Sequence, residues 1–298
     1  MDRRRSIPLL LVLGALLLPS LAVAQIEANL SKYTGPNAEG YLTPLKDGIG
    51  AALQSGQNRS AALPQGKWQF NLDLKTAFVK FADGDRTFQA KTEEGFLPAT
   101  NVEVPTVIGD VEAVTVPGQG GTVAVFPGGL DVGSLGLAVP QLTIGVPIGS
   151  QLLVRYIAVE TGDAEIGELS LLGLGARHSI SQYVASMPFD LAAGFLWQKF
   201  ELGTDLIDAT ALSFGVQASR QYSVLEPYLG LSLDAFEMSV DYEYGNETPP
   251  DKLSVDFDRS SDVHFLGGLG LNLKFFHLYG EVGHSSQTSY ALGLSLGN

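Results

Sequence analysis

The chain has 298 residues, no cysteine and a formal net charge of −14 at pH 7. The lack of cysteine excludes disulfides, thiolate metal sites and cysteine nucleophiles. The acidic balance also argues against a nucleic-acid partner, because such partners are bound by clustered Lys and Arg. The chain combines 35 glycines and 15 prolines with 45% hydrophobic and 17% charged residues. That mixture is typical of many strands joined by turns.

The first 24 residues have the pattern of a secretory signal. Three arginines at positions 3–5 precede an apolar run over 9–18, and Ala22-Val23-Ala24 provides a small-residue cleavage site. The apolar run is shorter than the roughly 20 residues of a spanning helix, so we expect cleavage after Ala24 rather than a membrane anchor. No later stretch is long and apolar enough for a spanning helix. The sequence therefore predicts an exported protein.

Residues 25–66 differ from the rest of the chain. Apolar side chains recur every four residues and form one helical face, at Tyr41, Leu45, Ile49 and Leu53. Pro44 and nearby glycines weaken this pattern, so we expect one or two short helical turns. Two roles stay open for this region: a plug or cap at one mouth of a barrel, or an ordinary surface helix that packs on the fold.

From Trp68 onward the period changes to two. Apolar and polar side chains alternate over residues 68–75 and again in runs of about 9–13 residues between 135 and 296, close to the roughly 9–11 residues of a tilted transmembrane strand. The non-apolar face is built from Gly, Ala and Ser with scattered acids, which suits the inside of a barrel. In lipid such a sheet must close, because every backbone group needs a partner. Residues 67–298 are thus predicted to form an all-β, closed antiparallel transmembrane β-barrel; a soluble periplasmic β-sandwich is the alternative.

The number of strands follows from eleven strand-sized runs. Single-chain bacterial barrels have even numbers of strands. One further strand inside the Pro- and Gly-rich insertion 83–136 would give twelve, which we predict within a range of 10–14, with a loop of that insertion folding over or into the barrel. Fusion of residues 225–244 into one long bent strand would instead give ten.

If the apolar face points outward, a set of charged side chains points into the lumen. These are Arg155, Glu226, Asp234, Glu237, Asp241, Glu243 and Lys274. They indicate either a cation preference or polar path through the barrel, or solvated charges close to loops. The four histidines show no metal-ligand spacing, so no metal site, cofactor or catalytic residue is predicted. Ser295 lies in a G-x-S-x-G match, but no helix follows it as a nucleophile elbow requires.

Several stretches carry a resemblance to a known family: residues 41–56, 140–157, 173–184 and 226–244. They resemble a family of uncharacterised bacterial proteins that is grouped with outer-membrane β-barrels and carries a domain-of-unknown-function label. The resemblance covers nearly all of the predicted mature chain, and its most specific part is the run RHSISQY, with Arg177, His178, Ser179, Gln182 and Tyr183. The layout is also similar to that of hydrophobic-compound transporters of the fatty-acid type.

Three functional hypotheses follow. The first is an outer-membrane barrel that passes small or hydrophobic compounds, with residues 25–66 as a partial plug and with outer-membrane lipid and a small hydrophobic ligand as partners. The second is a structural or adhesive barrel with a filled lumen. The third, an outer-membrane lipid-modifying enzyme, would use His178. The substrate and the oligomeric state do not follow from the sequence.

Overall fold

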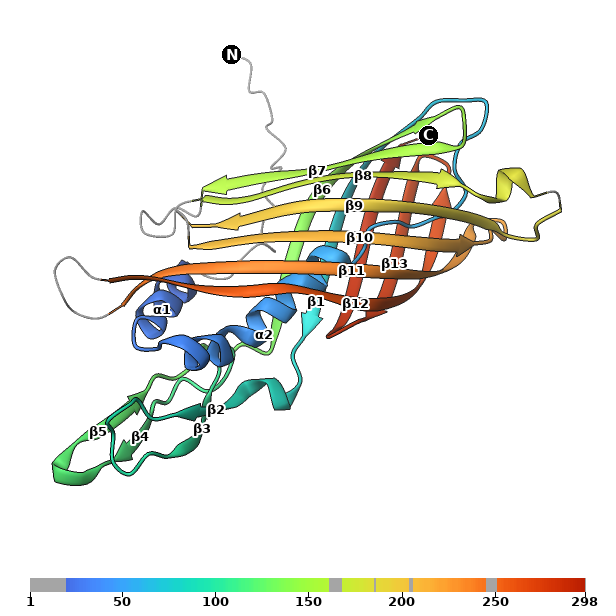
Figure 1. Ribbon diagram of the computed structural model, residues 1–298. Helices are drawn as coiled ribbons and strands as arrows, with labels where there is room; N and C mark the ends of the chain where they lie inside the picture. Colours follow the sequence, from blue (N-terminus) through green and yellow to red (C-terminus); the bar gives the residue numbers. More distant parts are fainter. Residues whose placement is uncertain (1–19, 161–167, 185, 204–205, 245–250, 298) are drawn as a thin grey trace, which may run out of the picture.

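A computed structural model describes residues 20–160, 168–184, 186–203, 206–244 and 251–297 of the chain (Figure 1). Ten of the described strands close into one antiparallel barrel in the order β1-β14-β13-β12-β11-β10-β9-β8-β7-β6. Their bounds are β1 Gln69–Lys80, β6 Ser134–Val146, β7 Ser150–Glu160, β8 Glu168–Ser179, β9 Asp190–Leu202, β10 Ile207–Ser219, β11 Leu225–Tyr244, β12 Asp251–Leu273, β13 Phe276–His284 and β14 Thr288–Gly297. The expected closed antiparallel barrel is confirmed, whereas the prediction of twelve strands is wrong.

The count is ten because β11 is a single strand. Residues Leu225–Tyr244 pair with β12 along their length, with a register shift between Phe236 and Met238 instead of a turn. The segment from Asp234 to Glu237 contains neither Gly nor Pro, so nothing there favours a reversal of the chain. A local irregularity in the pairing bends the long strand without ending it.

The insertion between β1 and β6 adds no strand to the barrel. It forms two separate two-stranded sheets, β2 (Thr87–Lys91) with β3 (Asn101–Pro105) and β4 (Val114–Pro117) with β5 (Val123–Phe126). Short 3-10 turns η3 (Asp83–Arg86) and η4 (Gln119–Gly121) accompany them. Both sheets lie beyond one end of the barrel, beside the N-terminal helices (Figure 1). The expectation that this insertion supplies a barrel strand is therefore wrong.

Two helices precede the barrel: α1 (Ser20–Leu30) and α2 (Gly35–Gln54). The prediction of one or two short turns is wrong, because α2 has 20 residues and contains Pro44. Most of its length is buried, and burial of apolar surface outweighs the helix-breaking tendency of Pro and Gly. Helix α1 includes the predicted cleavage site, and residues 1–19 lie outside the described residues, so the signal peptide stays a prediction. No helix in the described part of the chain combines the length and apolar character needed to cross a membrane.

The tertiary contacts show that the chain passes lengthwise through the barrel before β1 begins. We call the opening where β1 begins and β14 ends the short-turn end, and the opposite opening, beside the two small sheets, the helix end. Gly48 of α2 lies against Phe81, close to the helix end, whereas Gln65 forms a β-bridge with Ile148, in the turn between β6 and β7 at the short-turn end. Residues 50–66, here called the plug segment, thus run through the lumen.

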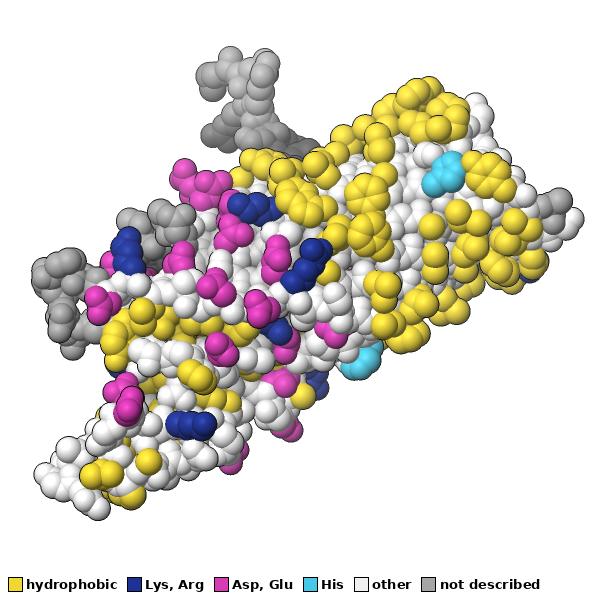
Figure 2. Space-filling model, viewed as in Figure 1, with side chains coloured by type: hydrophobic (Ala, Val, Ile, Leu, Met, Phe, Trp, Pro, Cys, Tyr) yellow, Lys and Arg dark blue, Asp and Glu magenta, His cyan; other side chains and the backbone are white. Residues whose placement is uncertain are grey.

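The outer surface of the barrel has two zones. Large apolar side chains are exposed around the half at the short-turn end, and Asp, Glu, Lys and Arg cover the other half (Figure 2). Strand β11 crosses the boundary: Leu233 is 62% exposed and Asp234 only 2%, but Phe236 and Val240 are buried beyond them. The side-chain alternation continues unchanged, so the polar and apolar faces exchange places along one strand.

This exchange corrects three of the predicted lumen residues. Glu237, Asp241 and Glu243 are exposed on the outside of the barrel. The assumption that the apolar face points outward holds only for the half at the short-turn end. We call the exposed apolar side chains around that half the apolar outer band. Nearer the helix end, the inner apolar side chains pack around α1 and α2 in a conventional hydrophobic core, which also buries Tyr33 and Tyr41. The Tyr41 hydroxyl donates to Gly128 O at 3.1 Å, and burial raises the pKa of this phenol to about 12.

Candidate functional site in the barrel lumen

The C-terminal end of α2 is capped by the barrel wall. A helix leaves its last carbonyl groups without partners and carries a partial negative charge at that end. Arg155 on β7, buried in the lumen, donates to Leu53 O and to Gly56 O, each at 3.2 Å. Gln198 on β9 donates to the same Leu53 carbonyl at 2.7 Å. A cation thus meets the negative end of the helix where the chain leaves the helical conformation.

The guanidinium of Arg155 is itself held by the wall. Its Nε donates to Gln141 Oε1 at 2.9 Å, and a second nitrogen donates to Gln198 Oε1 at 3.0 Å. These bonds come from β6 and β9, the strands on either side of the β7–β8 hairpin. Because the buried charge is hydrogen-bonded on several sides, its orientation toward the plug segment is fixed before the plug contributes.

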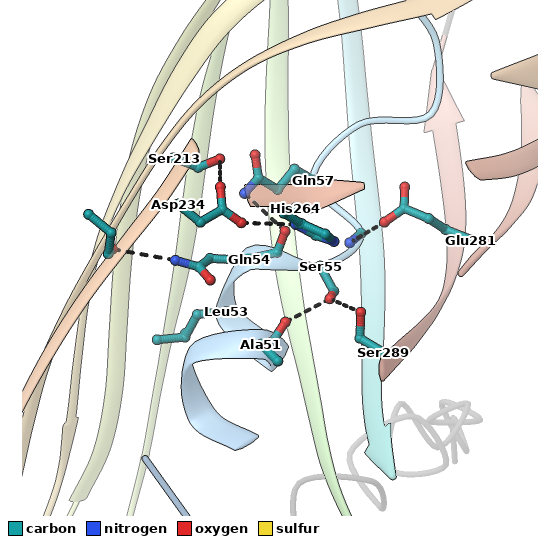
Figure 3. A network of polar contacts seen from close by, with 12 residues as sticks. Ala51, Leu53, Gln54, Ser55, Gln57, Ser213, Asp234, His264, Glu281 and Ser289 are labelled. Carbon is teal, nitrogen blue, oxygen red and sulfur yellow. Dashed lines mark hydrogen bonds and ion pairs between the residues drawn. The ribbon is translucent and has the colours of Figure 1, made fainter. Parts of the chain in front are cut away.

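A second polar network surrounds the segment just after the helix (Figure 3). Ser55 Oγ donates to Ala51 O and lies 2.6 Å from Ser289 Oγ on β14. The amide nitrogen of Gly56 donates to Glu281 Oε1 on β13 at 2.8 Å. The plug is therefore bonded to strands on opposite sides of the barrel, through its backbone and through the Ser55 hydroxyl.

The same network contains a buried acid–imidazole pair. Asp234 Oδ2 lies 2.9 Å from Nδ1 of His264, and Ser213 Oγ donates to the other carboxylate oxygen at 2.6 Å. These residues come from the neighbouring strands β11, β12 and β10. The second imidazole nitrogen of His264 has no hydrogen-bond partner among the described residues. The two side chains satisfy one another next to the plug, and removal of either leaves the other buried without this hydrogen bond.

Tyrosine rings occupy the space above the inner glycines. A Cβ at Gly293 would lie 1.8 Å from the ring of Tyr279, and one at Gly268 would lie 2.2 Å from the ring of Tyr228. The Tyr279 hydroxyl donates to Gly56 O at 3.1 Å and accepts from Lys75 Nζ at 3.0 Å. The small inner face predicted from the sequence therefore makes room for aromatic side chains and the plug.

A polar cavity of about 270 Å³ lies between the plug and the short-turn end. Hereafter called the vestibule, it is lined by amide and charged side chains, including Arg59, Asn71, Asp73, Glu226 and His277. Glu226 is held in place by Ser219 Oγ and Asn272 Nδ2, each at 2.7 Å. In the vestibule, polar groups of the plug and of the wall face open space.

The family-like run ties the plug to the rim of the short-turn end. Arg177 points inward and donates to Ser60 O of the plug and to Gln217 Oε1. His178 lies between Ser150 Oγ at 2.6 Å and Tyr183 OH at 2.8 Å, with Gln182 also at 2.8 Å. Ser179 is buried next to Ser181, within 3.3 Å. The hydrogen bonds of this run connect β7, β8, β10 and η5 (Ser181–Tyr183), and they bring the Ser150 hydroxyl to the His178 imidazole at the rim.

The other predicted lumen charges are placed as follows. Arg155, Glu226 and Asp234 are buried inside the barrel. Lys274 is exposed in the turn after β12 and lines the mouth of the vestibule. The interior residues that sequence reasoning missed include Asp73, Lys75, Gln198, His264 and Glu281. Asp73 and Lys75 had a signal, since they occupy the polar face of the first alternating run. His264 and Glu281 had the same kind of signal, because each alternates with outward apolar side chains on its strand. Within the described ranges, no group of three or more His, Cys, Asp or Glu is arranged to hold a metal ion.

Fold and interior together define a closed antiparallel β-barrel with its own N-terminal segment threaded through the lumen. Residues 4–298 match the model of a protein family described as a family of unknown function, DUF6588. The chain belongs to this family, which confirms the resemblance found in the sequence. A comparison with curated proteins found no match.

Comparison with solved structures gives weak likenesses to outer-membrane proteins. A loop-deleted OmpT, an outer membrane protein of Vibrio cholerae, aligns at 10% identity and TM-score 0.28 over 78% of this chain and 98% of its own. The outer membrane protease OmpT of Escherichia coli aligns at 10% identity and TM-score 0.30 over 77% and 95%. The Ralstonia pickettii toluene transporter TbuX aligns at 9% identity and TM-score 0.21 over 80% and 90%. At these TM-scores the likenesses support no conclusion about this chain.

Proposed function

We propose that the protein is an outer-membrane β-barrel whose lumen is closed by its own N-terminal segment. In this proposal the barrel spans the membrane and holds the helix end, with its two small sheets, at the membrane surface. The observation that carries this proposal is the apolar band around one half of a closed barrel. On β11 the band extends from Leu225 to Leu233, a length that suits a tilted strand in lipid. Soluble proteins rarely expose a continuous apolar surface of this extent to water.

Lipid is the partner that this surface fits. An apolar groove of about 560 Å³ lies on the outer wall, lined by side chains such as Leu74, Leu269 and Leu292. Its shape and chemistry suit an acyl chain, and this is where a small hydrophobic ligand would also bind. In outer-membrane barrels the short turns face the periplasm and the long loops face outward. That rule assigns the short-turn end to the periplasm.

The closed lumen supports a structural role over an open pore. Arg155, Gln198 and Glu281 bond the backbone of the plug, so the plug leaves only when several buried polar groups lose their partners together. Each such loss costs about 1–3 kcal/mol. The proposal includes no enzymatic activity. Accordingly, His178→Ala is expected to leave the lipid composition of the cell unchanged.

Fractionation and conductance test this proposal. The protein should occur in the outer membrane and should change its gel mobility on boiling, as folded barrels do. In planar bilayers the wild type should show no steady conductance, whereas deletion of residues 35–66 should open a pore. If the deletion variant lacks the heat-dependent shift, the double variant Arg155→Met, Arg177→Met is tested for pore opening in its place. Both substitutions remove hydrogen bonds to the plug. A freely soluble wild type, or a steady open pore, contradicts the proposal.

A gated passage is the second candidate, favoured by a specific observation. Several buried polar atoms near the plug lack partners among the described residues, including His264 Nε2 and Glu281 Oε2. An incompletely paired interface separates at lower cost than a fully paired one. A cysteine pair at Ser55 and Ser289 would lock the plug. If solute uptake by the wild type is lost in the oxidised pair and returns on reduction, the plug is a gate; without uptake in either state, the barrel is closed.

A further inference from the structure

The inner wall at the vestibule carries buried polar atoms that have no hydrogen-bond partner among the described residues. Asn71 Oδ1, His277 Nε2 and Ser295 Oγ lack hydrogen bonds, and they are three of the five buried side-chain atoms of this kind in the described residues. Asn71 is 3% and His277 8% exposed, and both line the cavity. Burying a polar atom without a partner costs free energy. Two of these atoms therefore point to a molecule that the vestibule binds.

The register of three neighbouring strands places these atoms together. Asp73 on β1 lies opposite Ser295 on β14, and Ser295 lies opposite His277 on β13. Adjacent strands are about 4.8 Å apart, so Asp73 and His277 lie side by side on the inner wall, two strand spacings apart, with Ser295 between them. Asn71 is the next inward residue along β1. One patch of wall thus carries the carboxylate, the amide oxygen and the imidazole nitrogen.

The unpartnered atoms on this patch accept hydrogen bonds. Asn272 Nδ2 donates to Glu226 Oε2 at 2.7 Å, so its Oδ1 is an acceptor. His277 Nδ1 lies 3.0 Å from that oxygen and must carry a proton. The neutral imidazole then presents Nε2 as an acceptor. Asp73 receives one hydrogen bond in the described residues, from Thr143 Oγ1 at 3.0 Å. The patch therefore suits a ligand that donates several hydrogen bonds.

Cationic side chains line the vestibule next to this patch. Arg59 has Asn272 Oδ1 as its one hydrogen-bond acceptor among the described residues, at 2.9 Å, although a guanidinium offers five donors. Arg177 and Lys274 also line the cavity. Guanidinium groups bind carboxylates with two parallel hydrogen bonds. A carboxylate therefore suits these cations, and an ammonium suits the neighbouring patch of acceptors.

We propose that the vestibule binds a small zwitterion of the amino-acid type, with its carboxylate on Arg59 and its ammonium on Asn71, Asp73 and His277. The cavity volume of about 270 Å³ lies just below the usual range of small-molecule pockets, so the ligand is compact. This inference concerns the folded barrel in any environment and does not depend on whether the plug moves.

Calorimetric titration of the detergent-purified full chain tests the proposal with four matched probes. L-Serine carries both charged groups, ethanolamine lacks the carboxylate, glycolate lacks the ammonium and glycerol lacks both. Serine should bind, and each of the other three should bind at least about tenfold more weakly, as expected for the loss of a charge-assisted hydrogen bond. Absence of serine binding, or equal binding of glycerol or of a singly charged probe, overturns the proposal.

Three variants separate binding from folding. Asn71→Leu and His277→Leu each remove an acceptor and should weaken serine binding at least about tenfold. Ser295→Ala is the matched control, because Ser295 is buried and unpartnered on the same wall but does not line the cavity; it should leave binding unchanged. All three should retain the heat-dependent gel shift. If one leucine variant does not fold, the other decides, and unchanged serine affinity in a folded leucine variant contradicts the assignment.

Discussion

Ser55 and Ser289 are separated by 234 positions in the chain, yet their hydroxyl oxygens lie 2.6 Å apart inside the barrel. Ser55 follows the last turn of α2, and Ser289 belongs to β14, the strand that closes the barrel against β1. One hydrogen bond thus joins the N-terminal segment in the lumen to the C-terminal strand of the barrel. The contact fixes the position of the plug relative to the barrel wall.

The first prediction uses this contact. The chain has no cysteine of its own, so the double variant Ser55→Cys, Ser289→Cys offers one pair of thiols. Because the two oxygens are already in contact, the sulfur atoms should reach disulfide distance without movement of the backbone. Mild oxidation should give nearly complete cross-linking, measured as a mobility difference between oxidised and reduced unfolded protein. The two single variants are the controls, and a folded double variant that does not cross-link would show that the plug lies elsewhere.

The second prediction concerns the buried pair of Asp234 and His264. Asp234→Leu leaves His264 in the lumen without its carboxylate, and we expect the free energy of unfolding to fall by about 3–5 kcal/mol. His264→Phe in the same chain removes the stranded imidazole and should recover part of that loss. Denaturant unfolding in detergent micelles measures both effects. Additive losses in the double variant would mean that the two side chains are not coupled.

The third prediction compares two outward positions on β11. Leu231 lies in the apolar outer band, and Glu237 lies on the charged half of the same strand. Leu231→Arg should reduce the free energy of folding into lipid vesicles by about 2–4 kcal/mol. Glu237→Arg should change it by less than about 0.5 kcal/mol, as expected of an exposed site in water. Equal effects at both positions would place the membrane boundary somewhere else.

The fourth prediction concerns the two ends of the barrel. Glu112 is exposed on the insertion at the helix end, and Arg220 is exposed in the turn at the short-turn end. In intact cells, a membrane-impermeant maleimide should label Glu112→Cys and should label Arg220→Cys only after the outer membrane is opened. The reverse pattern would show that the chain is inserted the other way round. Labelling of both in intact cells would contradict the membrane-spanning arrangement.

The strand pattern could be predicted because each strand carries its own signal. On β14, Tyr290, Leu292 and Leu296 are exposed and Ser289 and Ser295 are buried, as their alternation indicates. The number of strands could not be predicted so well. Whether the chain turns at Asp234–Glu237 or continues depends on pairing with β12, and that partner is supplied by distant residues.

The interior could be predicted only in part. Arg155 was identified from its position on a polar face, but its role depends on Leu53 and Gly56, about a hundred positions away in the chain. Nothing in the local sequence around His264 or Glu281 reveals that their strands, β12 and β13, pair with one another beside the plug. The assignment of Glu237, Asp241 and Glu243 to the lumen failed because local alternation separates the two faces without saying which face is inside.

The sequence by itself determined the strands, their two-sided character and the barrel class, because alternation with a period of two is a local property of an extended chain. The tertiary structure alone decided that α2 and the plug segment occupy the lumen and that the inner surface changes from polar to apolar along β11. The physical reason is that a side chain is buried or exposed according to what lies opposite it. In this protein the inner side chains lie opposite an N-terminal segment of the same chain, and the outer side chains are apolar in one half of the barrel and charged in the other.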